Sequence, residues 1–268
     1  MGTAKLNHIA IASDYYAMNA LYYQALFGLR AAKNFRPARA QVVSDGVVGM
    51  NIVPRRDGRC SGLDHFGFEV EDIEDTIDKI TKFDSSLVAI KRPPVRPYAA
   101  FSGHDPDANI FDISQRGIGF QEDVYAEKLE PTTRHFDHFA LRTLHGERCA
   151  QFYSEVFDMT PLNKKFDDDN YYLTDGNMTL AILQWKMEDF ADTDPQRLGP
   201  DHIGFKVESV DKVMEDLDDL TGQNPHLRAR SIGYGMEGEA RLDMFKKCPL
   251  GTGHLTDIEG VYIHLNEE

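Results

Sequence analysis

Four short stretches of the chain combine apolar residues with one histidine at the same point. Each stretch has an Asn or Asp, then the histidine, then a run of apolar and small residues. Short apolar-rich runs of this kind predict buried β-strands. The stretches are LNHIAIAS from Leu6, LDHFGFEV from Leu63, FDHFALRT from Phe136 and PDHIGFKV from Pro200, and their histidines are His8, His65, His138 and His202.

The chain repeats itself at a spacing of 130 residues, without a gap, from its first histidine strand to Gly46 and from its third to Gly176. Apolar and aromatic pairs recur at the spacing of one helix face, and two Asp-Gly dipeptides lie between apolar-rich runs, which is typical of β-hairpins. Each unit therefore reads as a strand, a helix and a hairpin-rich set of strands. The aligned residues are His8 with His138, Tyr22 and Tyr23 with Phe152 and Tyr153, Leu26 and Phe27 with Val156 and Phe157, and Asp45-Gly46 with Asp175-Gly176.

A second shift, of 137 residues, relates the other two histidine strands, GLDHFGFEV from Gly62 and GPDHIGFKV from Gly199. A helix is predicted after each of them, with Asp72 and Ser209 as the N-cap residues because they stand immediately before Ile73 and Val210. The apolar positions of these helices also correspond. They are Ile73, Ile77 and Ile80 in one copy and Val210, Met214 and Leu217 in the other.

The repeats divide the chain into four modules that pair into two domains. The polar, charged segment 119–133, which contains Pro131, interrupts the strand pattern and is predicted to be a linker. The first domain is predicted at 1–118 and the second at 134–268. Their modules are 1–57, 58–118, 134–196 and 197–268.

Charge and composition exclude several classes of partner. The chain has 268 residues, with 29 Lys and Arg against 44 Asp and Glu, and its net charge of -15 argues against nucleic acid and against an anionic membrane surface. The sequence contains neither a signal-peptide pattern nor a transmembrane run. Cys60, Cys149 and Cys248 are widely spaced and predict neither a disulfide framework nor a zinc ribbon. A reducing cytoplasm is the expected location.

The repeated histidines are candidate metal ligands. A single such histidine is more often a core residue, but the chain has only ten histidines, and Val or Ile would serve stability better at four matching strand positions. If paired modules pack about a pseudo-two-fold axis, His8 meets His65 and His138 meets His202. Two ligands hold a metal poorly, so each pair needs a third.

Each predicted domain offers a third ligand in its closing strand. Aligning HDPDANIFDIS with TDIEGVYIHLN places Asp112 opposite His264, four residues after the small residue of a turn. The first set, His8, His65 and Asp112, is a two-histidine, one-carboxylate set that leaves positions open for substrate and oxygen. The second set, with His138, His202 and His264, is all nitrogen and suits zinc, iron or copper.

These residues resemble the vicinal oxygen chelate superfamily, which includes glyoxalase I, fosfomycin-resistance thiol transferases, bleomycin-binding proteins and extradiol ring-cleaving dioxygenases. The resemblance covers nearly the whole chain. It implies an α+β fold of four βαβββ modules, paired into two cupped, incomplete-barrel domains around metal sites. The closing motif D-P-D-G-N followed by a strand ending in Glu-Leu matches DPDANIFDI from Asp105, so the family's metal ligands carry over to His8, His65 and Asp112.

The same carry-over in the second half gives His138, His202 and His264. Two departures matter. Asp112 is one methylene shorter than the usual Glu, and His264 replaces the carboxylate, which leaves a stronger Lewis acid less suited to extradiol chemistry. The first domain is therefore the predicted active site.

Three functions are implied by this resemblance. The first is an extradiol-type ring-cleaving dioxygenase that uses Fe(II), dioxygen and a small catechol-like or other vicinal-oxygen substrate. The second is a glyoxalase-type lyase or isomerase, or a thiol transferase, with Zn, Mn or Ni. The third is a non-catalytic small-molecule-binding resistance protein, which is disfavoured because such a protein needs no buried ligand triads. Homo-oligomer formation is left open.

Four further residues are candidate acid–base groups. His104 precedes the closing strand of the first domain, and His254 precedes that of the second in a glycine-bearing segment. Tyr98 and Tyr234 are added because an imidazole or a tyrosine in this region assists proton transfer in ring-cleaving relatives. Residues of these types in loops more often serve the surface or packing.

Overall fold

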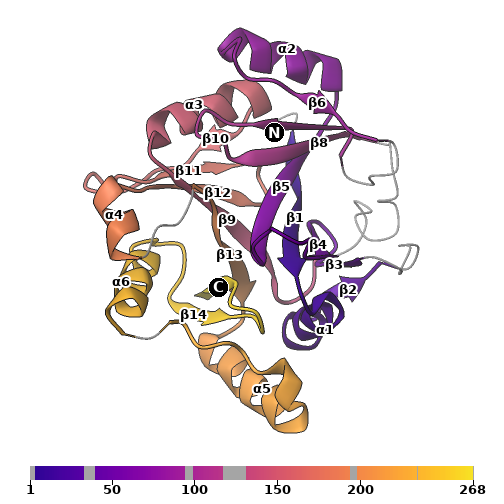
Figure 1. Ribbon diagram of the computed structural model, residues 1–268, viewed down its shortest axis with the longest axis vertical. Coiled ribbons are helices and arrows are strands. Elements are labelled where there is room, and N and C mark those ends of the chain that lie inside the picture. The colour runs from indigo at the N-terminus through magenta and orange to yellow at the C-terminus, as the bar shows by residue number, and fades with distance from the viewer. Residues whose placement is uncertain are drawn as a thin grey trace.

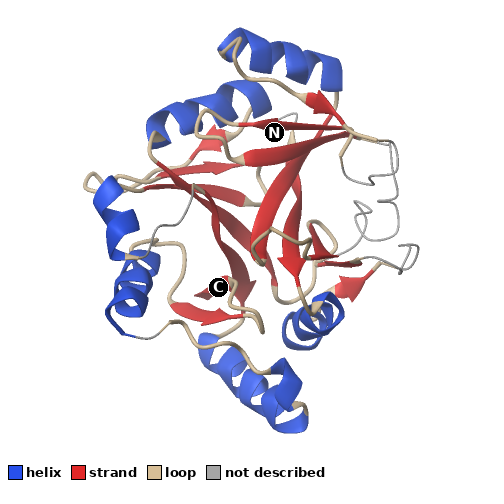
Figure 2. Ribbon diagram, in the orientation of Figure 1, coloured by secondary structure: helices blue, strands red, loops and turns tan. Residues whose placement is uncertain are grey.

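The chain folds into two open, mixed β-sheets that lie together at the centre, with helices around them (Figures 1 and 2). The computed structural model describes residues 4–32, 40–93, 99–116, 131–193, 198–233 and 235–267. Within these residues the sheets do not close into a barrel. The predicted α+β class with two repeated, cupped halves is confirmed.

The first sheet joins the two modules of the first half. Its strands run in the order β2-β3-β4-β1-β5-β8-β7-β6. The two histidine strands, β1 and β5, are antiparallel neighbours at its centre, while β4 and β8 flank them in parallel. The bounds are β1 Lys5–Ser13, β2 Arg30–Ala31, β3 Gln41–Ser44, β4 Gly49–Pro54, β5 Gly62–Val70, β6 Ile90–Lys91, β7 Phe101–His104 and β8 Ile110–Gln115.

The second sheet repeats this arrangement in the order β10-β11-β12-β9-β13-β15-β14. The register is conserved residue for residue: His8 faces Gly49 and Gly67 in the first sheet, as His138 faces Thr179 and Gly204 in the second. These pairs keep the sequence offsets of the repeats. The bounds are β9 His135–Thr143, β10 Thr160–Pro161, β11 Tyr171–Thr174, β12 Thr179–Gln184, β13 Gly199–Val207, β14 Gly253–Thr256 and β15 Tyr262–Glu267.

The first helix of each half ends at a left-handed residue, Gly28 with φ 69° or Asp158 with φ 54°. Asp72 and Ser209 cap α2 and α5, as predicted. Helices α4 and α6 and the 3₁₀ helix η1 are additions that the repeats did not predict. The bounds are α1 Tyr16–Phe27, α2 Ile73–Phe83, α3 Gly146–Phe157, α4 Met187–Asp192, α5 Val210–Gln223, η1 Pro225–Leu227 and α6 Gly235–Lys246.

A single aromatic-rich core joins the two sheets. Phe27 of α1 stacks on Phe205 of the second sheet, and Phe157 of α3 stacks on Phe68 of the first, each at 4.0 Å between ring centroids. Each half thus inserts its first helix against the other half, and α1 contacts α5 while α2 contacts α3 (Figure 1). Because the apolar faces meet here, the opposite faces of the sheets remain for the histidines.

The predicted Asp-Gly hairpins are present between β3 and β4 and between β11 and β12, with Gly46 and Gly176 at φ 107° and 96°. Most of the predicted linker falls on 117–130, outside the described residues. In the described part of the chain, no helix has the length and apolar character that a membrane crossing requires.

Candidate metal centres

Each of the four repeated histidines is preceded by a β-bulge. Along β1 and β5, the register passes from Leu6↔Phe68 to His8↔Gly67, which leaves Asn7 as an extra residue. The same happens at Asp64 in β5, at Asp137 in β9 and at Asp201 in β13. An extra residue reverses the alternation of the strand, so the histidine turns to the face opposite the core.

The bulged residue also holds the histidine next to it. The Nδ1 atoms of the four imidazoles lie 2.6 to 2.8 Å from the side-chain oxygens of the preceding Asn or Asp. A carboxylate or amide oxygen that accepts the Nδ1–H fixes the tautomer and leaves Nε2 to bind a metal. The dipeptide Asn/Asp-His, repeated four times, was the sequence signal for this role. The pairs are Asn7–His8, Asp64–His65, Asp137–His138 and Asp201–His202.

A glycine faces one histidine in each sheet. A Cβ added to Gly67 would lie 2.1 Å from Cε1 of His8, and one added to Gly204 would lie 2.1 Å from Cε1 of His138. No side chain fits at this distance, so the imidazole occupies the space that a larger residue would fill. The glycine two residues after His65 and His202 therefore belongs to the site, although sequence reasoning did not single it out.

We expect Gly67→Ala to displace the His8 ring, to lower the free energy of unfolding by about 1–3 kcal/mol through overpacking and to weaken metal binding at the first cluster. Denaturant titration and metal titration measure the two effects. Gly222→Ala is the matched control, because a Cβ there meets nothing within 4 Å. Metal affinity equal to that of the control would contradict the expectation.

The first cluster consists of His8, His65 and Asp112, whose ligand atoms lie within 4.8 Å of one another. Asp112 Oδ2 is 3.3 Å from His65 Nε2 and 4.0 Å from His8 Nε2. The other oxygen, Oδ1, accepts a short hydrogen bond from the Ser102 hydroxyl, which in turn accepts one from Arg92 Nε at 2.6 Å. The structure thus brings the predicted first triad together and orients its carboxylate from behind.

Burial and charge set the protonation of this cluster. Burial, with repulsion from His65, lowers the pKa of His8 to about 3. Burial also opposes the charge on His65, yet hydrogen bonds to Asp112 and Asp64 outweigh it and raise the pKa to about 9. The carboxyl of Asp112 is held below its usual pKa, since the bond to His65 overcomes the cost of burial. Without a metal, the cluster is a neutral imidazole beside an ion pair.

The second cluster contains His138, His202 and His264, as predicted, and also Cys248. The four ligand atoms lie within 4.8 Å of one another, and all four residues are buried. The imidazole rings are 5.2 to 5.4 Å apart between centroids. The cysteine was missed because it belongs to no repeat and no cysteine motif.

The second cluster has no carboxylate among its donors, and its groups are held neutral. Burial first, and then the neighbouring imidazoles, lower the pKa of His264 to about 2. Burial lowers the pKa of His202 to about 4, although Asp201 opposes this effect, and burial raises the pKa of the Cys248 thiol to about 12. The site therefore holds three imidazoles and one thiol in a low-dielectric setting.

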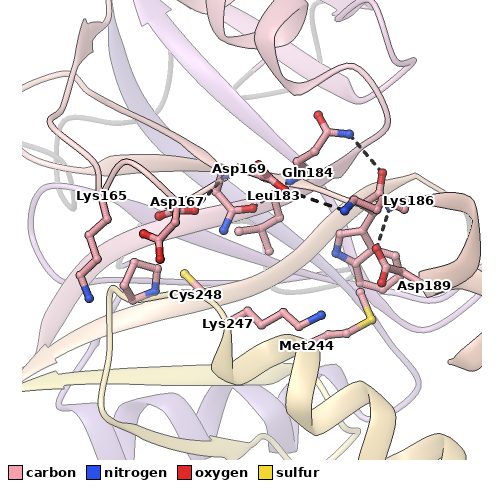
Figure 3. Close-up of a pocket in the computed structure, with 14 residues that line it drawn as sticks. Lys165, Asp167, Asp169, Leu183, Gln184, Lys186, Asp189, Met244, Lys247 and Cys248 are labelled. Carbon is pink, nitrogen blue, oxygen red and sulfur yellow. Dashed lines mark hydrogen bonds and ion pairs between the residues drawn. The ribbon is translucent and has the colours of Figure 1, made fainter.

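Access differs between the two clusters. The side chain of His65 is 18% exposed, whereas those of His138 and His202 are 0% exposed. A pocket of about 360 Å³ lies beside the second cluster and includes Cys248 in its lining, together with Met244 and Trp185 (Figure 3). Solvent thus reaches a ligand of the first cluster directly, while at the second it reaches the outer side of the thiol.

The other acid–base candidates are not part of either ligand set. His104 is half-buried at the end of β7, and its Nδ1 lies 2.9 Å from the carbonyl oxygen of Asp105. His254 pairs with His264 across β14 and β15, so it lies beside the second cluster rather than the first. Tyr98 and Tyr234 lie outside the described residues.

The turns before the closing strands are built alike. Asp105 and Asp257 accept hydrogen bonds from backbone N–H groups two and four residues later. Tyr153 donates its hydroxyl to Asp105, and Tyr23 donates its hydroxyl to Asp257, so each turn is fixed by the first helix of the other half. The positions of Asp112 and His264 therefore depend on packing between the halves.

Comparison with known families bears on this geometry. The family model of the Glyoxalase/Bleomycin resistance protein/Dioxygenase superfamily matches residues 5–113 and 135–228. The chain belongs to this superfamily. The two matched segments begin on the first and third histidine strands, and the resemblance seen in the sequence is confirmed. No curated protein sequence matches the chain significantly.

Solved structures share the fold of this superfamily member. A Mn(II)-bound glyoxalase from Novosphingobium aromaticivorans superposes with a TM-score of 0.66 at 13% identity, covering 100% of this chain and 83% of the glyoxalase. The 2,3-dioxygenase LapB from Pseudomonas sp. KL28 gives 0.63 at 14% identity, with 98% and 92% covered.

A xylose isomerase-like TIM barrel/4-hydroxyphenylpyruvate dioxygenase fusion protein gives a TM-score of 0.61 at 14% identity. The match covers 98% of this chain, which spans about half, 49%, of the fusion protein. At such identities, all three likenesses establish the fold and leave the reaction to be argued from the site.

Proposed function

We propose that the first cluster holds a divalent metal, Fe(II) in the first place, and that the protein is an extradiol-type ring-cleaving dioxygenase acting on a small catechol-like or other vicinal-oxygen substrate. One observation carries the proposal. Two imidazoles and one carboxylate converge from three adjacent strands, β1, β5 and β8, and one of the imidazoles is reached by solvent. A facial set of this kind leaves several positions of the ion free.

The residues present fit such an ion. Ligand atoms about 2.1 Å from a metal and at right angles to one another are about 3 Å apart. The carboxylate oxygen of Asp112 is already 3.3 Å from His65 Nε2 and 4.0 Å from His8 Nε2, so closing the site requires shifts of less than about 1 Å. The hydrogen bonds from Asn7 and Asp64 aim both Nε2 atoms at the shared space.

When bound, the metal supplies a Lewis-acid centre that can hold two neighbouring oxygens of a substrate. The chain's own residues supply position and charge. Asp112 offsets part of the metal charge, and Ser102 and Arg92 fix its carboxylate. His65, backed by the carboxylate of Asp64, is a more basic ligand than His8, backed by the amide of Asn7. In this scheme, His104 is the group of the first half that accepts or returns a proton during turnover.

Metal analysis of anaerobically purified protein tests the proposal, together with oxygen uptake on a panel of catechols. Iron in the first cluster and oxygen consumption with ring cleavage support it. Nickel, zinc or manganese in that cluster without oxygen uptake would overturn it in favour of a glyoxalase-type lyase, isomerase or thiol transferase. A first cluster that holds no metal under these conditions would favour the binding protein instead.

The proposal includes a reducing cytoplasm as the place of action. Cys60, Cys149 and Cys248 are all free thiols. Fractionation of the native cells tests the location, and recovery of the protein outside the cytoplasm would contradict it.

Metal affinity of the first cluster is expected to rise with pH. His65, with its pKa raised to about 9, carries a proton at neutral pH and must lose it to bind a metal. Between pH 6 and 8, the apparent affinity for Mn(II) should therefore rise about tenfold per pH unit. Calorimetric titration of His264→Ala protein, which lacks one ligand of the second cluster, measures this slope.

Asp64→Asn is the matched control for the pH effect. Without that carboxylate, the pKa of His65 falls, so the rise should level off at a lower pH than in the parent protein. An affinity that does not change between pH 6 and 8 in the parent would contradict the expectation.

A further inference from the structure

Cys248 lies among three histidines that come from a different part of the fold. The histidines stand on β9, β13 and β15, while the cysteine comes directly after α6. All four residues are buried, and their ligand atoms lie within 4.8 Å of one another. The first cluster has no such fourth donor among the described residues. The second cluster thus differs from it both in its donors and in their number.

Several ring nitrogens of the second cluster are buried without a hydrogen bond. In the described part of the chain, Nε2 of His138, Nε2 of His202 and Nδ1 of His264 have no partner. The Nδ1 atoms of His138 and His202 lie against Asp137 and Asp201, so the orphaned atoms are on the other side of each ring. Buried polar atoms without partners are costly, and three in one cluster point to a missing ligand.

We propose that the second cluster is a closed tetrahedral zinc site in which His138, His202, His264 and the Cys248 thiolate fill all four positions. Imidazole nitrogen and thiolate sulfur are the donors that zinc takes in sites of this shape. Four protein ligands leave no position for a substrate. The site is therefore structural, and its role goes beyond the oxygenase chemistry proposed for the first cluster.

The charges around the cluster suit such an ion. A divalent zinc with one thiolate and three neutral imidazoles carries a net single positive charge. Two carboxylates, Asp137 and Asp201, face it through the rings of His138 and His202. Arg241 donates to the second oxygen of Asp201 at 2.7 Å and offsets part of that negative charge. No isolated charge is left buried.

The site would attach α6 to the sheet. Only Arg241 and Phe245 of this helix are buried, so it has few apolar anchors. Phe245 packs 4.7 Å from the ring of His202 and 4.8 Å from that of His264, and Arg241 reaches the aspartate behind His202. With Cys248 two residues beyond the helix, every one of these contacts converges on the cluster. Zinc would join them into one unit.

The neighbouring pocket gives an ion a way in. Cys248 belongs both to its lining and to the donor cluster, and Figure 3 shows this side chain beside Lys247 and Met244 at the end of α6. Acidic side chains line the same pocket and attract cations. They are Asp167, Asp168, Asp169 and Asp189.

Zinc alone and cobalt(II) alone are the probes for the test. Zinc-edge X-ray absorption on Asp112→Ala protein loaded with one equivalent of zinc reads the donors directly, without relying on turnover. The expected shell is one sulfur at about 2.3 Å and three nitrogens at about 2.0–2.1 Å. A shell of nitrogen and oxygen without sulfur would overturn the proposal while leaving the proposed oxygenase untouched.

Cobalt(II) in the full-length protein gives the second readout. Wild type and Cys60→Ser, which alters an exposed thiol, should both show the sulfur-to-cobalt charge-transfer band and the intense visible bands of a tetrahedral site. Cys248→Ser should lose the sulfur band and bind zinc more than about 100-fold more weakly, since loss of a group behind a ligand already costs roughly 10–100-fold. A sulfur band that survives in Cys248→Ser would refute the assignment.

The structural role has its own measurement. Removing zinc from the wild type with a chelator should speed hydrogen exchange across 235–246 and leave exchange in α2 unchanged. Equal protection of α6 with and without zinc would show that the ion does not hold this helix, and would overturn that part of the proposal.

Discussion

Asp112→Ala protein is expected to lose the metal of the first cluster and to show turnover no higher than background. The substitution removes the only carboxylate of the set and leaves two imidazoles, too few to hold a divalent ion tightly. The fold should remain, because Asp112 faces away from the core between the sheets. Metal content after anaerobic purification, oxygen uptake and circular dichroism together measure these effects.

His264→Ala is the matched comparison for this variant. His264 faces Gly204 across β13 and β15, just as Asp112 faces Gly67 across β5 and β8. It should lose metal from the second cluster and keep the metal of the first. If Asp112→Ala protein keeps its full metal and normal rate, the active site belongs to the second half and the proposed function is wrong.

The repeats made much of the site predictable from the sequence. A strand that recurs at a fixed offset recurs with its register, so the four histidines had to occupy matching places in the two sheets. The third ligands were indicated by the closing turns, where Ala108 and Gly260 both take left-handed φ values of 64° and 97°. Aligning those turns placed Asp112 and His264 correctly opposite one another.

Simple alternation could not predict which face the histidines occupy. With a period of two, His8 would lie on the same face as Leu6, which is 3% exposed and belongs to the core. The bulge at Asn7 reverses the alternation, and a bulge depends on pairing with another strand that the sequence does not specify. The need for Gly67 is hidden for the same reason, since it arises from a ring on the neighbouring strand.

The fourth donor of the second cluster could not be predicted either. Cys248 comes after α6, which has no counterpart in the repeats and only two buried residues, so neither internal alignment nor apolar periodicity indicates where it lies. Its neighbours in space are separated from it by between 16 residues, for His264, and 110 residues, for His138. Only the folded chain shows that a lone cysteine completes a set of three histidines.

The halves are joined by a reciprocal pair of hydrogen bonds that the sequence also did not reveal. Asp175 Oδ2 accepts from the backbone N–H of Leu6 at 2.7 Å, and Asp45 Oδ2 accepts from that of Phe136 at 2.9 Å. Each aspartate belongs to the hairpin of one half and reaches the first strand of the other. Both N–H groups are one or two residues from a ligand histidine, so these bonds link packing between the halves to the position of the clusters.

Removal of this link is expected to have the largest effect on stability. Asp175→Ala would leave three backbone N–H groups without their acceptor, those of Leu6, Asn177 and Met178. Hydrogen bonds to a charged group are each worth about 1.5–3 kcal/mol, so the free energy of unfolding should fall by about 3–5 kcal/mol after partial relaxation. Urea denaturation monitored by circular dichroism measures the change, and Asp57→Ala, at an exposed position, should stay within about 0.5 kcal/mol of wild type.

Asp175→Asn separates the turn from the link between the halves. The amide keeps an oxygen for the N–H groups of Asn177 and Met178 but directs an NH₂ group at the N–H of Leu6, so only the link is lost. We expect it to lose about half as much stability as Asp175→Ala. If Asn behaves like wild type while Ala is strongly destabilised, the aspartate serves its own hairpin alone and the two halves are held by their aromatic core.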